Sequence, residues 1–144
     1  MSAFFAPLQT EAMLHISGPD SLTFLQGQTT CDTRDVGPSR AVPGAYCNVQ
    51  GRMVCDFLLL ELAQEQFALR LKADTLENAA ATFGKYIVFS KAKLQADNRD
   101  WQVFGCWGES AADSLRSLKL TLPSGRYQAI SGDGYVLVQM DDAG

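Results

Sequence analysis

Apolar residues along the chain form strand-like runs in three neighbouring stretches and then recur at helical spacing in a fourth. Two of the runs, residues 45–49 and 52–62, flank a glycine-containing turn at 50–51. A glycine in a short connection between two such runs is typical of a β-hairpin. Residues 67–71 alternate as a third strand, and between 74 and 86 apolar residues at three- and four-residue steps predict an α-helix. The pattern therefore predicts three consecutive strands followed by a helix.

Shorter elements are predicted on both sides of these four. A strand at 12–16 precedes a helix that starts near residue 20 and ends at Gly27. Residues 33–44 are rich in glycine, proline, serine and aspartate, so they are predicted to form a loop. Further extended segments are predicted at 87–89 and 92–94.

Four polar residues at 97–100 follow the last extended segment and predict a domain boundary. Beyond them the pattern is strand, helix, strand, strand, whereas a ferredoxin-like domain continues with one more helix and strand. We therefore expect a first subdomain at 1–96 and an incomplete second, ferredoxin-like subdomain at 97–144. The elements expected in the second are a strand at 102–106, a helix at 110–118 and strands at 127–130 and 135–140.

The incomplete second subdomain predicts how the chain behaves in solution. Apolar residues continue up to Met140, so the last strand is expected to bury one face. Without the missing helix and strand, apolar surface or an unpaired strand edge is exposed, and such edges pair with other chains. The chain is therefore predicted to be the N-terminal fragment of a longer protein and to self-associate.

Composition and charge narrow the classes of function. The 144 residues are 47% apolar and 19% charged, as in an ordinary globular protein. No apolar stretch approaches the roughly 20 residues of a membrane span, and the first residues do not resemble a signal peptide. A net charge of −4 argues against direct nucleic-acid binding. Four cysteines without CxxC spacing and a single histidine argue against a zinc site. We expect a cytoplasmic protein with reduced thiols.

The charge is unevenly distributed along the chain. Residues 66–96 carry a net charge of +3, whereas the segments before and after them are net negative. Two interpretations stay open for this basic segment: an ordinary solvated surface or a secondary contact for an anion. Its cations are Arg70, Lys72, Lys85, Lys91 and Lys93.

Asp56 is the most informative side chain in the sequence. In a strand, alternate residues share a face, so Asp56 shares its face with Val54, Leu58 and Leu60. A carboxylate in an apolar row is costly unless something satisfies it. It is either a recessed acid, base or anchor for a polar heterocycle, or it lies at a solvent-facing strand end or beside a partner elsewhere in the fold. We predict that Asp56 is at least partly buried and points toward a concavity shared with the hairpin.

Three further polar residues, Asn48, Gln50 and Arg52, cluster at the tip of the same hairpin. They are compatible with plain turn chemistry and with ligand contacts. Glycine-rich phosphate loops and nucleophile elbows are absent from the sequence.

Three sequence blocks stand in order at consistent spacing. The first is ISGPDS at 16–21 with FLQGQTT at 24–30 and Asp32. The second is NVQGRM at 48–53 with Asp56, and the third is KYIVFSK at 85–91. Together, from about residue 12 to residue 94, they resemble the YgfZ-type folate-binding proteins, relatives of the glycine cleavage T-protein, an aminomethyltransferase.

The resemblance implies an α+β, aminomethyltransferase folate-binding-like fold with ferredoxin-like subdomains, mixed or antiparallel sheets and a central opening. It implies tetrahydrofolate or a one-carbon derivative as ligand, with Asp56 contacting the pterin and Asn48 and Arg52 beside it. Lys85 and Lys91 are then candidate contacts for an anion, such as the glutamate tail of a folate or a nucleic-acid client. The family has no known need of a metal of its own.

Two functions from different classes follow from the resemblance. One is an accessory protein that binds folate and supports the maturation or repair of iron–sulfur client enzymes, including those that modify tRNA. The other is an aminomethyltransferase-type enzyme that transfers a one-carbon unit to tetrahydrofolate. The first and third blocks fit the YgfZ type better, although the late K-G-C-aromatic-x-G-Q-E block of that type is absent here. An α+β domain without a ligand is the third possibility.

Overall fold

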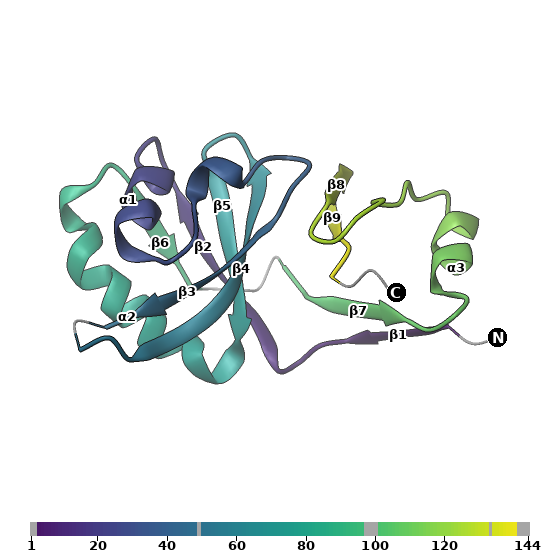
Figure 1. The fold of residues 1–144 in the computed structure, drawn as a ribbon, viewed down its shortest axis with the longest axis horizontal. Coiled ribbons are helices and arrows are strands. Elements are labelled where there is room, and N and C mark those ends of the chain that lie inside the picture. The colour runs from purple at the N-terminus through teal and green to yellow at the C-terminus, as the bar shows by residue number, and fades with distance from the viewer. Residues whose placement is uncertain (1–2, 49, 97–100, 133, 141–144) are drawn as a thin grey trace.

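The computed structural model describes residues 3–48, 50–96, 101–132 and 134–140, and its largest element is a five-stranded antiparallel sheet (Figure 1). The strand order is β3-β4-β5-β2-β6. The strands are β2 Glu11–Ser17, β3 Val42–Cys47, β4 Met53–Ala63, β5 Gln66–Lys72 and β6 Lys93–Gln95. The predicted hairpin and the strand after it are confirmed as β3, β4 and β5.

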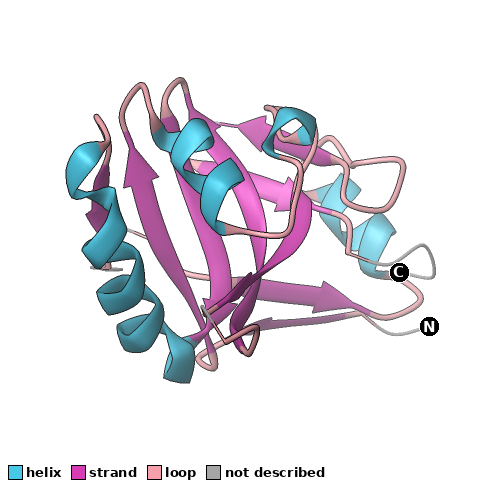
Figure 2. Cartoon of the chain, turned by 60° about the vertical axis from the view of Figure 1, so that its left-hand side comes forward, coloured by secondary structure: helices cyan, strands magenta, loops and turns pink. Residues whose placement is uncertain are grey.

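Two helices cover one face of this sheet (Figure 2). They are α1 Ser21–Gln28 and α2 Leu76–Tyr86, and a 3-10 turn at Ala73–Thr75 leads into α2. Phe83 of α2 is fully buried between them, with its ring centroid 4.4 Å from that of Tyr46 and 5.9 Å from that of Phe24. The apolar residues that recur at helical spacing thus lie on the side of α2 that packs on the sheet.

The opposite face of the sheet carries a second, smaller core. Leu58 and Leu60 point to this face and pack with Met13 and Ala68, whereas Leu59 points to the helices. Because β4 is covered on both faces at this point, its apolar run is continuous and does not alternate. Side chains from the C-terminal part of the chain, including Val138, pack against this second core.

The remaining elements form two small antiparallel pairs and a helix, on the right of Figure 1. β1 and β7 pair along their whole length, and β8 and β9 form a hairpin. The predicted strand, helix, strand, strand series is confirmed with shifted ends, whereas β1 was not predicted because its two phenylalanines are adjacent and both exposed. The bounds are β1 Phe4–Pro7, β7 Phe104–Trp107, α3 Ala111–Ser117, β8 Ala129–Gly132 and β9 Tyr135–Val138.

Pairing of β1 with β7 brings the first residues beside the C-terminal region, across the division expected at residue 97. The boundary residues 97–100 lie outside the described part of the chain, so the two-subdomain division stays a prediction. Among the helices of the described segments, none has the length and apolar character needed to cross a membrane.

Two local predictions are wrong. Part of the predicted loop at 33–44 is strand, because β3 begins at Val42 and pairs with Leu59 of the long strand β4. Pro43 is tolerated there because β3 is an edge strand. The segment Ile87–Phe89 is a 3-10 turn that continues α2 and not an extended strand, with only Ile87 buried.

Candidate functional site

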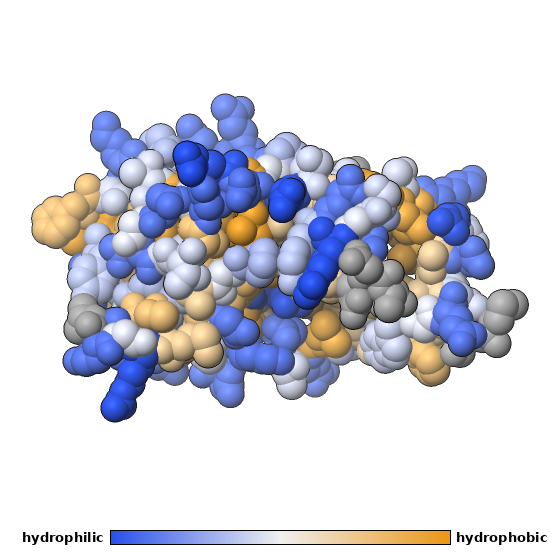
Figure 3. All heavy atoms as spheres, in the orientation of Figure 1, coloured by the Kyte–Doolittle hydropathy of each residue, from blue (hydrophilic) through white to orange (hydrophobic). Residues whose placement is uncertain are grey.

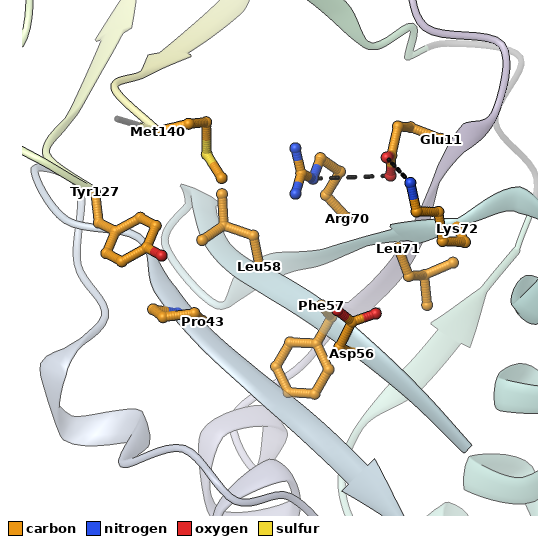
Figure 4. A pocket seen from close by; sticks show the side chains of 10 residues that line it. All are labelled: Glu11, Pro43, Asp56, Phe57, Leu58, Arg70, Leu71, Lys72, Tyr127 and Met140. Carbon is orange, nitrogen blue, oxygen red and sulfur yellow. Dashed lines mark hydrogen bonds and ion pairs between the residues drawn. The ribbon is translucent and has the colours of Figure 1, made fainter. Parts of the chain in front are cut away.

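A cavity of about 290 Å³ opens on the second face of the main sheet (Figure 4). Its floor is formed by β4 and β5, one side by the start of β2, and the other side by the C-terminal segment. This volume lies at the lower end of ligand pockets, roughly 300–1,000 Å³, so the cavity has room for one ring system. The lining residues are Glu11, Pro43, Asp56, Phe57, Leu58, Arg70, Leu71, Lys72, Tyr127 and Met140.

Asp56 lines this cavity, as the sequence predicts, but the prediction that it is at least partly buried is wrong. It lies on β4 two residues before Leu58 and opposite Ala45 of β3, and its side chain is exposed. The physical reason is that the C-terminal segment covers the row at Leu58 and Leu60 and does not reach Asp56. The carboxylate is therefore hydrated at the rim of the concavity and can accept hydrogen bonds from a ligand without a large desolvation cost.

Arg70, Lys72 and Glu11 form an ion-pair group on the other side of the cavity. Glu11 begins β2 opposite Lys72, and its Oε1 lies 3.2 Å from the Lys72 Nζ. Its Oε2 lies 4.0 Å from the Arg70 Nε. The side chain of Glu11 is only 12% exposed, so the two cations offset the cost of burying its charge.

The Arg70 guanidinium differs from the other polar groups of the cavity in its hydrogen bonding. Its side chain is 27% exposed, and its Nε is buried and has no hydrogen-bond partner among the residues that the structure describes. In Figure 4 the guanidinium extends from β5 into the space between Met140 and Glu11. Since Arg70 pairs with Leu58 of β4 and Met13 of β2, it is a cation within an apolar row, as Asp56 is an anion within one. These apolar neighbours belong to other strands, whereas along β5 Arg70 shares its face with Gln66, Ala68 and Lys72, so the pattern of that strand alone did not mark it as a site residue.

Tyr127 supplies the aromatic wall of the cavity from a distant part of the sequence. Its φ of 64° lies in the left-handed region, which is uncommon for a bulky residue and often marks a functional site. Its backbone is held on both sides, because its carbonyl accepts from the Ala41 amide and its amide donates to Gln139. The Arg126 guanidinium stacks on its ring at 4.9 Å from the centroid. No local pattern in the sequence indicated this residue.

The hairpin-tip residues do not join this cavity. Asn48 Oδ1 accepts hydrogen bonds from the amides of Gln50 and Arg52, each at 3.0 Å, and so closes the turn. The Arg52 side chain is exposed, and neither Asn48 nor Arg52 lines the cavity. The turn-chemistry interpretation accounts for Asn48, and the folate contacts expected of both residues stay predictions.

The five cations of the basic segment do not form one surface. Arg70 and Lys72 face the cavity, whereas Lys85 lies on α2, on the opposite side of the sheet. Lys85 and Lys91 are exposed and flank the 3-10 turn Ile87–Phe89. Apolar side chains project at the left-hand end of the molecule, beyond α2 (Figure 3), and Phe89 of this turn is 94% exposed. An anion contact at Lys85 and Lys91 stays a prediction.

Residues of the first sequence block stabilise the local structure. The Gln26 Oε1 accepts from the amide and the hydroxyl of Thr33, which ties α1 to the following turn. Asp32 accepts from the amide and the guanidinium of Arg34, and these hydrogen bonds lower the pKa of its carboxyl to about 2. Within the described residues, no group of three or more histidine, cysteine or acidic side chains could hold a metal ion.

The four cysteines are free, and they differ in exposure. Cys55 is buried on β4, and burial raises the pKa of its thiol to about 11. Cys47 is exposed at the end of β3.

We expect iodoacetamide at pH 8 to alkylate Cys47 in the native protein and to leave Cys55 unmodified, because the thiolate is the reacting form. Peptide mass spectrometry measures both, and urea-unfolded protein, in which both sites should react, is the control. Equal native labelling would contradict the burial of Cys55.

Comparison with known proteins shows which family the chain resembles in sequence. The sequence profile of the GCVT N-terminal domain matches residues 5–128. A Haemophilus influenzae protein named only as uncharacterized is 32% identical over 126 residues, which are 88% of this chain and 44% of that protein. The tRNA-modifying protein YgfZ of Cronobacter sakazakii is 33% identical over 116 residues, 81% of this chain and 35% of that protein.

A solved structure shows the same fold. Aminomethyltransferase T of the glycine cleavage system from Bartonella henselae superposes with a TM-score of 0.78 at 18% identity, over 90% of this chain and 36% of that one. The chain therefore has the aminomethyltransferase-like fold that the sequence implied, and it spans less than half the length of these relatives. With most of its length matched, the chain belongs to the GCVT N-terminal domain family.

Proposed function

We propose that the protein binds tetrahydrofolate or a one-carbon derivative in the cavity beside Asp56. The observation that supports this most directly is the composition of the cavity: an exposed carboxylate and a guanidinium whose Nε has no hydrogen-bond partner in the described part of the chain, on an apolar floor. The pyrimidine ring of a reduced pterin is planar and carries N–H donors and a carbonyl acceptor at its edge. Asp56 accepts from the donors, and Leu58 and Tyr127 pack against the ring.

We further propose that the folate-bound protein acts in the cytoplasm as an accessory factor for the maturation or repair of iron–sulfur enzymes, including tRNA-modifying ones. Support comes from the relatives named tRNA-modifying protein YgfZ, which are 28–34% identical. The likeness to the aminomethyltransferase, at 18% identity, concerns the fold alone. The accessory role is therefore preferred to one-carbon transfer.

Replacing Asp56 with asparagine tests the folate proposal. We expect the affinity for 5-formyltetrahydrofolate to fall about tenfold or more, because a hydrogen bond to a charged acceptor contributes roughly 1.5–3 kcal/mol. The fold should persist, since the side chain is exposed. Isothermal titration calorimetry measures the affinity, and the thermal midpoint reports the fold. Asp113→Asn on α3, an exposed aspartate outside the cavity, is the matched control. Wild-type affinity in Asp56→Asn would contradict the assignment.

Cells lacking the protein separate the two roles. An accessory role predicts reduced activity of an iron–sulfur tRNA-modifying enzyme, restored by the wild-type gene and not by Asp56→Asn. An enzymatic role predicts instead that the purified protein forms methylenetetrahydrofolate from an aminomethylated carrier protein. Formation of that product would overturn the accessory assignment.

A further inference from the structure

We propose that Arg70 donates a hydrogen bond to a carbonyl oxygen on the same ring that Asp56 binds. The protein then selects a 4-oxo heterocycle over a 4-amino one. This inference rests on the proposed function, because it names the chemical feature by which that cavity recognises its ligand. Its starting point is the guanidinium of Arg70 on the cavity floor, whose Nε has no hydrogen-bond partner among the described residues and which lies beside the largely buried carboxylate of Glu11.

The hydrogen-bonding capacity of Arg70 is unused within the described residues. Its Nε is buried without a hydrogen bond, and the nearest carboxylate oxygen, Glu11 Oε2, is 4.0 Å away. That carboxylate is already bound by Lys72 at 3.2 Å through its other oxygen. A buried donor without a partner is costly. Because this Nε is enclosed, an acceptor in the cavity contacts the guanidinium through its terminal nitrogens, and the side chain is 27% exposed. Glu11 neutralises and positions the guanidinium, while the donors of Arg70 remain available to a ligand.

The sheet register fixes how far Arg70 lies from Asp56. Arg70 is directly opposite Leu58, and Asp56 is two residues before Leu58 on the same face. Such diagonal neighbours on adjacent antiparallel strands are roughly 7–8 Å apart. The register thus fixes the separation of the two backbone positions, and it places an acceptor side chain and a donor side chain on a single wall of the cavity.

This spacing decides which part of a folate Arg70 meets. With Asp56 accepting from a ring N–H, the 4-oxo group of the same pterin is within reach of Arg70. The glutamate carboxylates lie beyond the p-aminobenzoyl group, and a cavity of about 290 Å³ has room for one ring system and not for a whole folate. The 4-oxo oxygen is an acceptor for the guanidinium, whereas a 4-amino group offers N–H donors that the guanidinium cannot accept. Arg70 is therefore a specificity-determining contact.

The test compares tetrahydrofolate with its 4-amino-4-deoxy analogue, in which an amino group replaces the 4-oxo group and the neighbouring N3 loses its hydrogen. We expect the wild-type protein to bind the 4-oxo ligand at least tenfold more tightly, because a site built to hydrogen-bond one group rejects the analogue that lacks it. In Arg70→Met, which keeps the apolar stem, that ratio should fall to near one. Arg116→Met on α3 removes a guanidinium elsewhere and should keep the wild-type ratio. If Arg70→Met fails to fold, Arg70→Lys, which keeps the charge, should still lower the ratio.

The outcomes separate this inference from the proposed function. If the wild-type protein binds neither ligand, the folate proposal fails. If it binds tetrahydrofolate and Arg70→Met keeps the wild-type ratio, the folate proposal stands and the role of Arg70 is wrong. Tetrahydropterin without a tail tests the remaining alternative. If Arg70→Met weakens binding of tetrahydrofolate but not of tetrahydropterin, Arg70 contacts the glutamate tail and the ring assignment is overturned.

Discussion

Replacing Phe83 with alanine is expected to lower the free energy of unfolding by about 3–5 kcal/mol, the usual cost of removing a fully buried phenylalanine. The ring has no exposed surface and contacts the rings of Phe24 and Tyr46, so the substitution leaves a cavity between α2 and the sheet. Because α1 and β3 provide the other walls, they cannot collapse into the space without losing their own contacts. Urea unfolding followed by circular dichroism measures the change.

Phe89→Ala is the matched control for this loss. Phe89 is the same residue type, only six residues further along the chain, but it is 94% exposed. Its substitution should change the free energy of unfolding by no more than about 0.5 kcal/mol, as for surface positions in general. Equal losses in the two variants would mean that α2 does not pack on the sheet through Phe83.

The contrast between Phe83 and Phe89 shows what the sequence can predict. Phe83 belongs to a helical repeat of apolar residues that runs through α2, and such a repeat identifies the buried side. Phe89 follows the last turn of this helix, in a segment too short to show a period. A short apolar run there is compatible with a strand, and only the packing of Ile87 shows that the chain turns.

The edge strand β3 shows a second limit. Its composition is that of a loop, with Pro43 and Gly44 at its start. The strand forms because β4 extends far enough to offer hydrogen bonds opposite Val42 and because Gly44 lets the Phe57 ring and Cys31 approach. A Cβ on Gly44 would lie 2.8 Å from the Phe57 ring. These are tertiary requirements, and local propensity does not contain them.

The candidate site was only partly predictable for a similar reason. Alternation along one strand placed Asp56 on the face with Leu58, and the structure confirms that placement. Arg70 comes beside Asp56 through the register of β4 and β5, which depends on the turn and on an irregularity near its end. Tyr127 and Met140 come from the far end of the chain. Net charge in a sequence window could not show that Arg70 and Lys85 lie on opposite sides of the sheet.

Replacing Gly18 with alanine is expected to destabilise the protein by about 3 kcal/mol or more, through backbone strain and overpacking together. Gly18 has a φ of 120°, and an added Cβ would lie 2.5 Å from the carbonyl oxygen of Lys91. The obstacle is backbone, so it cannot move aside as a flexible side chain would. The loop must withdraw from the segment that leads into β6. Urea unfolding gives the total loss.

The loss at Gly18 should also have a local signature. Asp20 is held against Lys91 by two hydrogen bonds, from the Asp20 amide to the Lys91 carbonyl at 3.2 Å and from the Lys91 amide to Asp20 Oδ2 at 2.8 Å. Displacement of the loop lengthens both hydrogen bonds, so the Lys91 amide should exchange its hydrogen faster in Gly18→Ala.

Gly27→Ala is the control, and its effect on stability is expected to be of opposite sign. Gly27 lies inside α1 with no atom within 4 Å of an added Cβ, so alanine there should stabilise the protein by about 0.5–1 kcal/mol. A Gly18→Ala protein as stable as Gly27→Ala would show that the approach of this loop to Lys91 is not required by the fold.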